Sequence, residues 1–190
     1  MIRRVLILML AVTLPAGEAL AQLTVQILRG MAESVPIAVV PLAWDGAGPA
    51  PWDVAATVQA DLERSGRFRP LPRSQLIEQP HTAVDVDTAD WRMLKVDYVL
   101  VGRLAPAAGG RYELRYELVS VASGERLLGT AVPVDARALK RASHRVSDAV
   151  YEKILGVRGA FATRIAYVAV DGPVTKRNFR LIVSDADGAN

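Results

Sequence analysis

VDYVLVGRL, at residues 96–104, and RYELRYELV, at residues 111–119, decide the fold predicted for this 190-residue chain. The first stretch is apolar almost throughout, which is typical of a central strand buried on both faces of a sheet. The second alternates apolar and charged residues, which predicts a strand with one face in the core and one in water. Its apolar face comprises Tyr112, Leu114, Tyr116 and Leu118. Ser123 and Gly124 then indicate a turn, so residues 126–134 are expected to complete a hairpin.

A further buried strand is predicted upstream, because residues 36–42 read PIAVVPL without a polar side chain. A helix should follow it. Asp53 is a good N-cap, the apolar residues Val54, Val58 and Leu62 recur every four positions, and Ser65-Gly66 is a stop signal. Residues 68–71 are expected to return to the sheet as a short strand, and Asp87 to cap a short helix that runs to Leu94.

A longer helix is predicted after the hairpin, with Asp135 as its cap and Gly156 at its end. One face of this helix is apolar: Leu139, Ala142, Val146, Ala149, Val150 and Ile154. Strands and helices in this order predict an α/β domain at residues 22–159, in which helices pack on a mixed β-sheet.

The pattern changes after Gly159. Residues 164–170 and 178–183 read as two strands joined by a Gly-Pro turn, and no third strand follows. Two strands alone are marginal in water. We therefore expect residues 160–190 to begin a second, all-β domain that this chain does not contain in full.

The N-terminus has the three parts of a secretory signal. Arg3 and Arg4 supply positive charge, residues 5–14 are apolar, and Ala19-Leu20-Ala21 is a small-residue cleavage site. The apolar run is roughly ten residues, against the ~20 that a helix needs to cross a bilayer. Residues 1–21 are thus expected to be removed between Ala21 and Gln22. The absence of cysteine excludes disulfides, thiolate metal sites and a lipid-anchored cysteine.

Catalytic chemistry finds little support. The net charge of +3 comes from scattered residues, which argues against a nucleic-acid surface. Ser143, His144 and Asp148 have the composition of a catalytic triad, but neighbours on a helix do not face each other, and His144 is expected to be an ordinary polar residue beside the apolar stripe. Asp185-Ala186-Asp187-Gly188 could start a calcium loop, yet too few ligands follow, and a turn is favoured. No catalytic residue, metal or cofactor is predicted.

An alternative function uses loop carboxylates and tryptophans. The carboxylates are Asp45, Asp53, Asp85 and Asp87, and the tryptophans are Trp44, Trp52 and Trp91. Together they could serve a periplasmic hydrolase or a small-ligand-binding protein. More ordinarily, such carboxylates cap helices or lie in solvated loops, and such tryptophans cover the edge of a hydrophobic core.

Several long strings occur in the order found in one known family: PIAVVPLAWDG, DLERSGRFRPL, VDYVLVGRL, SHRVSDAVYEKILGVRGAFATRIAYV and SDADGAN. In these strings the chain resembles the TolB family of the bacterial Tol-Pal cell-envelope system. The resemblance implies an N-terminal α/β domain followed by a six-bladed β-propeller. Residues 164–183 would be the first strands of that propeller, so that the chain covers only the first part of the family.

The resemblance also implies a non-catalytic interaction protein of the periplasm, peripheral to the membranes. Inner-membrane TolA would bind its mature N-terminal arm, and the lipoprotein Pal would bind its propeller, for outer-membrane integrity and invagination during cell division. The matching arm is Gln22, Leu23, Thr24, Val25, Gln26, Ile27, Leu28, Arg29 and Gly30.

The alternation of apolar and polar residues in this arm favours strand addition to a partner's sheet, and the alternative is an edge strand of its own domain. The family tends to carry an acidic residue near the end of the arm, where this chain has Leu28 and Arg29.

Overall fold

The computed structural model describes residues 34–188. The signal segment at residues 1–21, the cleavage site between Ala21 and Gln22 and the arm at residues 22–30 lie outside the described residues. They remain predictions. Among the residues that are described, no helix is long and apolar enough to cross a membrane.

The sheet is mixed and has six strands, as predicted. The strands are β1 (Val35–Val39), β2 (Ala43–Trp44), β3 (Phe68–Pro70), β4 (Tyr98–Ala107), β5 (Arg111–Ser120) and β6 (Arg126–Asp135). Their order is β3-β1-β4-β5-β6, and β2 pairs with β4 beyond the end of β1. β1 is parallel to both neighbours, whereas β4, β5 and β6 are antiparallel. The apolar stretch at residues 96–104 therefore lies in the central strand.

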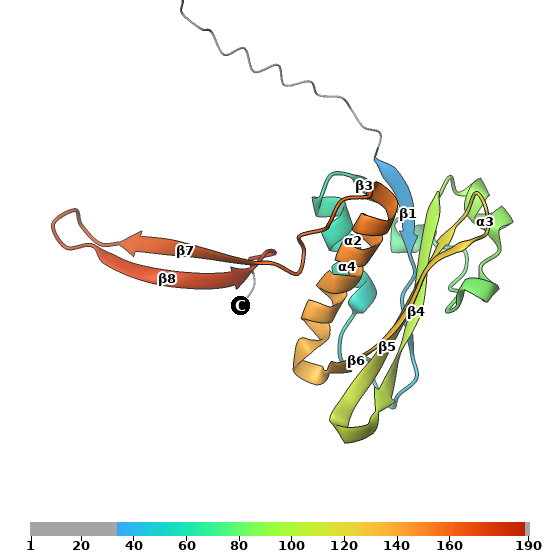
Figure 1. The fold of residues 1–190 in the computed structure, drawn as a ribbon, viewed down its shortest axis with the longest axis horizontal. Coiled ribbons are helices and arrows are strands. Elements are labelled where there is room, and N and C mark those ends of the chain that lie inside the picture. The colour runs from blue at the N-terminus through green and yellow to red at the C-terminus, as the bar shows by residue number, and fades with distance from the viewer. Residues whose placement is uncertain (1–33, 189–190) are drawn as a thin grey trace, which may run out of the picture. The chain divides into compact units, whose positions relative to one another are not determined.

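Two helices cover one face of this sheet and a shorter helix covers part of the other (Figure 1). α2 (Val54–Arg64) and α4 (Leu139–Leu155) pack on the inner face, over a core that includes Leu62, Leu114 and Val146. α3 (Thr88–Met93) covers a second core on the outer face, built around Trp91, Val99 and Val101. The predicted apolar face of β5 points to the inner core.

Two of the three predicted helix caps are confirmed. The Asp53 carboxylate accepts a hydrogen bond from the Ala56 amide, and the Asp87 carboxylate accepts one from the Ala89 amide. The prediction that Asp135 caps the long helix is wrong. Asp135 is the last residue of β6 and pairs with Arg111 at 3.2 Å. A 3₁₀ turn (Ala136–Ala138) has to redirect the chain before α4 can begin at Leu139.

β7 (Arg164–Asp171) and β8 (Asn178–Asp185) form an antiparallel hairpin, as expected. Its large apolar residues are exposed: Ile165, Tyr167, Val168, Val170, Val174, Phe179, Leu181 and Val183. A hairpin with this much exposed apolar surface is consistent with the first strands of a β-propeller, since it buries no core of its own within residues 34–188.

Candidate functional site

Ser143, His144 and Asp148, which have the composition of a catalytic triad, each contact a different partner. The Ser143 hydroxyl donates to the Leu139 carbonyl at 2.9 Å, one turn earlier in α4. The Asp148 carboxylate accepts hydrogen bonds from the amides of Phe161 and Ala162, so it anchors the chain that leaves the helix. His144 turns instead towards α2. The three side chains therefore form no relay, and the geometric argument against a triad is confirmed.

His144 is part of a buried polar pair between the two inner helices. Its Nδ1 lies 2.7 Å from Oδ2 of Asp61, and the Ser147 hydroxyl donates to the same oxygen at 2.7 Å. Asp61 is fully buried and His144 is 2% exposed. The prediction of an ordinary polar residue beside the stripe is wrong, because the partner of His144 is 83 positions away on another helix. A buried carboxylate needs such partners to remain in the core.

Asp185 ends β8 and Asp187 lies in the turn that follows it, which confirms the favoured interpretation of that segment. The Gly188 amide donates to the Asp185 carbonyl at 2.9 Å. Nζ of Lys140 lies 2.9 Å from the Asp187 carboxylate, and Nε of Arg164 lies 3.5 Å from that of Asp185. Basic side chains thus face both carboxylates, and within residues 34–188 no group of three or more acidic or histidine side chains could hold a metal ion.

The loop carboxylates are each held by a different partner. Arg73 donates two hydrogen bonds to Asp53, at 2.7 and 2.8 Å. These bonds hold the pKa of the Asp53 carboxyl below its ordinary value, although partial burial opposes the effect. Asp45 faces Arg103 at 3.5 Å, and Asp85 accepts a hydrogen bond from the Thr82 hydroxyl. These contacts are structural, and they give no acid–base pair.

The tryptophans do not share one platform. The Trp44 indole donates to the Gly48 carbonyl, and its ring lies against Tyr112 with 5.8 Å between ring centroids. The Trp52 indole donates to the hydroxyl of Thr57. Trp91 is fully buried in the core on the other face of the sheet. The fold therefore does not bring these three tryptophans together into one sugar-binding or ligand-binding surface.

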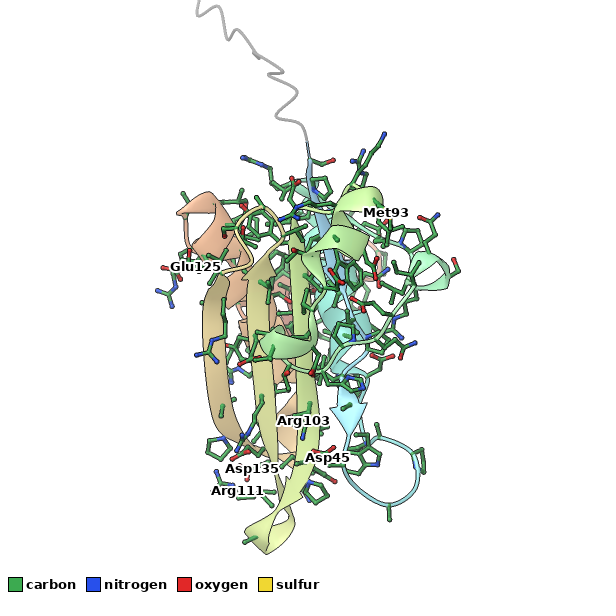
Figure 2. All side chains as sticks on the ribbon, turned by 90° about the vertical axis from the view of Figure 1, so that its right-hand side faces the viewer. Asp45, Met93, Arg103, Arg111, Glu125 and Asp135 are labelled. Carbon is green, nitrogen blue, oxygen red and sulfur yellow. The ribbon has the colours of Figure 1, made fainter. Side chains whose placement is uncertain are left out.

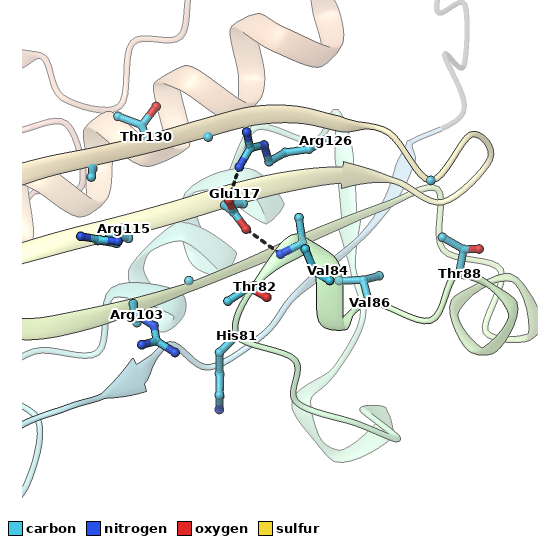
Figure 3. A pocket seen from close by; sticks show the side chains of 15 residues that line it. His81, Thr82, Val84, Val86, Thr88, Arg103, Arg115, Glu117, Arg126 and Thr130 are labelled. Carbon is cyan, nitrogen blue, oxygen red and sulfur yellow. Dashed lines mark hydrogen bonds and ion pairs between the residues drawn. The ribbon is translucent and has the colours of Figure 1, made fainter.

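An open hollow of about 1030 Å³ lies on the outer face of the sheet (Figure 3). The loop that contains His81 and Thr82 forms one wall, and β4, β5 and β6 form its floor. Glu117 holds the two sides together, because it accepts a hydrogen bond from the Ala83 amide and pairs with Arg126 at 2.7 Å.

Charges in this hollow are already neutralised within the fold. Arg115 pairs with Glu113 at 2.5 Å, and this contact raises the pKa of the Arg115 guanidinium. Arg103 pairs with Asp45 across the rim (Figure 2). In the lining loop, the Thr82 hydroxyl donates a hydrogen bond to the Asp85 carboxylate at 2.7 Å. Sequence reasoning missed this hollow because the loop reaches the strands only in the folded chain.

Comparison with known proteins identifies relatives of this fold. The family model of the TolB amino-terminal domain matches residues 23–127. The Tol-Pal system protein TolB of Xanthomonas oryzae pv. oryzae (strain KACC10331 / KXO85) is 49% identical over 185 residues, which are 95% of this chain and 42% of that protein. Its counterpart in Xanthomonas campestris pv. campestris (strain B100) is 49% identical over 169 residues, which are 88% of this chain and 38% of that protein.

A solved structure agrees with these relatives. The crystal structure of TolB from Acinetobacter baumannii matches with a TM-score of 0.71 and 30% sequence identity, over 83% of this chain and 37% of that one. The chain thus spans about two fifths of the length of the curated relatives it matches.

Proposed function

This chain belongs to the TolB family, and on that premise we propose that it is a non-catalytic, protein-binding component of the Tol-Pal system in the periplasm. The observation that carries the proposal is the 49% identity to Tol-Pal system proteins across nearly the whole chain. The contacts of the described residues support it, since the side chains with catalytic potential are committed to helix caps, ion pairs and one buried polar pair. This arrangement suits a scaffold that presents surfaces to partners.

The finer proposal is that the protein links inner-membrane TolA to outer-membrane Pal, and so serves outer-membrane integrity and invagination at cell division. The arm at Gln22–Gly30 would bind TolA. Its apolar residues Leu23, Val25 and Ile27 alternate with polar ones in the sequence, so they would share one side of the segment if it bound as a strand. An extended segment with a free end can add to the sheet edge of a partner. Cleavage after Ala21 would create the free end that this mode of binding needs.

The same proposal divides the chain into a signal peptide (1–21), an α/β domain (22–159) and the start of a β-propeller (160–190). The exposed apolar side chains of β7 and β8 support the last assignment, because further propeller strands would cover them. The Pal contact belongs to the propeller in this account, so residues 160–190 would carry at most part of it.

A capture experiment with purified TolA tests the arm. The chain that starts at Gln22 is compared with one that starts at Met31, and circular dichroism confirms that both have the same fold. We expect TolA to retain only the longer chain, because the shorter one lacks the strand that would be added. Equal capture of both chains would refute the arm, and capture of neither would refute the assignment of TolA as a partner.

A further inference from the structure

One edge of the sheet is long and unpaired within residues 34–188. The sheet ends at β6, which has ten residues, whereas β3 at the opposite edge has three. Figure 2 shows β6 along the outside of the sheet. An edge strand of this length presents a row of N–H and C=O groups with which another strand can pair.

An apolar groove of about 370 Å³ runs beside this edge, between β6 and α4. Val132 and Val134 line it from the strand, and Ala142 and Val146 line it from the helix. Three of these four side chains, those of Val134, Ala142 and Val146, are buried. Strand addition combines backbone pairing with pockets for alternate side chains, and this groove lies where the inward side chains of an added strand would point.

Apart from Asp135, which pairs with Arg111 at 3.2 Å, the charged residues that line the groove are basic. Arg141 and Arg145 lie one turn apart on α4 and are exposed, and Arg137 lies one turn earlier. None of the three has an ion-pair partner among the described residues, whereas Arg103, Arg111, Arg115 and Arg126 on the sheet each have one. Arginines without partners beside an apolar groove favour a ligand that brings negative charge.

We propose that the edge of β6 binds an extended acidic segment of a partner protein, which pairs with β6 and sets its carboxylates against Arg141 and Arg145. The chain's own arm fits poorly, because residues 22–30 include Arg29 and no acidic residue. A second copy also fits poorly, since pairing β6 with β6 brings two rows of arginines together. This surface is separate from the TolA arm, and the proposal does not rest on it.

Pro133 indicates which backbone groups would pair. Proline is tolerated in an edge strand where its nitrogen, which has no N–H, faces solvent. By the alternation of the strand, Gly129 and Ala131 then also turn their N–H and C=O groups outward. An added strand would pair with these two residues and stop at Pro133.

The test uses a labelled peptide, Thr-Glu-Thr-Val-Thr-Glu-Thr, and a control peptide in which lysine replaces both glutamates. Fluorescence anisotropy measures the binding of each to the chain of residues 22–190. We expect saturable binding of the acidic peptide only. The double variant Arg141→Glu/Arg145→Glu should weaken binding about tenfold, since it removes two attractions and adds two repulsions. Its matched control, Lys153→Glu/Arg158→Glu, has the same net charge outside the groove and should bind like the parent.

Ala131→Pro tests the strand pairing itself. It removes one outward N–H at a position where an edge strand tolerates proline, so the fold should persist by circular dichroism while peptide binding is lost. The proposal is overturned if the acidic peptide does not bind, if the lysine peptide or a peptide of residues 22–30 binds as tightly, or if either groove variant binds like the parent. Concentration-dependent dimerisation that Ala131→Pro abolishes would assign the edge to a second copy instead.

Discussion

Asp61 lies between α2 and α4, where His144 and Ser147 both contact the same oxygen of its carboxylate. Asp61→Ala would leave the His144 Nδ1 atom buried without its partner, whereas the Ser147 hydroxyl would keep its hydrogen bond to the Ser143 carbonyl at 3.2 Å. We expect the free energy of unfolding to fall by about 3 kcal/mol. Urea denaturation measures the change. Glu63→Ala, an exposed position on the same helix, is the control and should change it by less than about 0.5 kcal/mol. Similar values for both variants would show that the buried pair contributes little.

The ion pair of Asp53 and Arg73 predicts a pH dependence. The folded pKa of Asp53 lies below the ordinary value of 3.8, so ionised Asp53 stabilises the fold above that pH, and the contribution is lost as pH falls through the folded pKa. Asn is also a good N-cap, so Asp53→Asn removes chiefly the charge. Because the pair is partly exposed, solvent screening keeps its contribution at about 1 kcal/mol or less.

Stability of the parent and of Asp53→Asn should therefore differ at pH 7 and converge as the pH falls below 3.8. Denaturant midpoints at a series of pH values measure this difference. Arg73→Gln should remove most of the pH-dependent part, because it removes the partner charge, whereas the Ala56 amide still lowers the pKa of Asp53. A difference between parent and Asp53→Asn that stays constant down to low pH would contradict the assigned cause.

At the scale of elements, Gly102 explains how closely β4 and β5 approach. A Cβ atom at Gly102 would lie 2.3 Å from the Arg115 carbonyl oxygen, and a backbone atom in a central strand cannot move aside cheaply. We expect Gly102→Ala to lower the free energy of unfolding by about 1–3 kcal/mol. At Gly129, on the edge strand, the nearest atoms belong to the flexible Arg126 side chain, so Gly129→Ala is the matched control. Thermal unfolding that responds equally to both substitutions would contradict this account.

Local pattern was sufficient to predict most elements of this fold. The alternation in residues 111–119 predicts a strand because burial along β5 largely alternates. The apolar run in residues 96–104 predicts one because the middle of β4 is buried on both faces of the sheet. The prediction for Asp135 was wrong because a residue that caps helices well can also end a strand. Here the ion pair with Arg111, across the hairpin, keeps Asp135 at the end of β6. His144 and Asp61 could not be paired from sequence, since their contact depends on how α2 and α4 pack.

For the functional surfaces, sequence and structure contributed different parts. The arm at residues 22–30 was identified by resemblance and remains a prediction, because the structure describes residues 34–188. The groove between β6 and α4 has no sequence signal of its own, because it forms only where α4 folds back beside β6. Only the four-residue spacing of Arg137, Arg141 and Arg145 could have pointed to it.

At the scale of the whole molecule, Phe161 indicates where the α/β fold ends. Its ring lies 5.6 Å from that of Tyr151 on α4, and its amide bonds to Asp148. A chain that ends at Thr163 should therefore keep a melting temperature close to that of the full chain. A chain that ends at Val157 loses the aromatic contact and both hydrogen bonds to Asp148, and its melting temperature should fall by about 4–8 °C. Scanning calorimetry compares the three chains, and equal values for both truncations would place the boundary earlier.

The central claim is that this TolB-family chain acts by binding TolA through its N-terminal arm, and a calorimetric titration with TolA tests it most directly. Val25→Asp and Gln26→Asp would add the same charge on opposite sides of the arm when it binds as an added strand. If Leu23, Val25 and Ile27 enter the partner, Val25→Asp should weaken binding about tenfold or more, because a carboxylate would be buried, while Gln26→Asp stays close to the parent. Equal affinity of all three chains, or no binding by the parent, would contradict the claim.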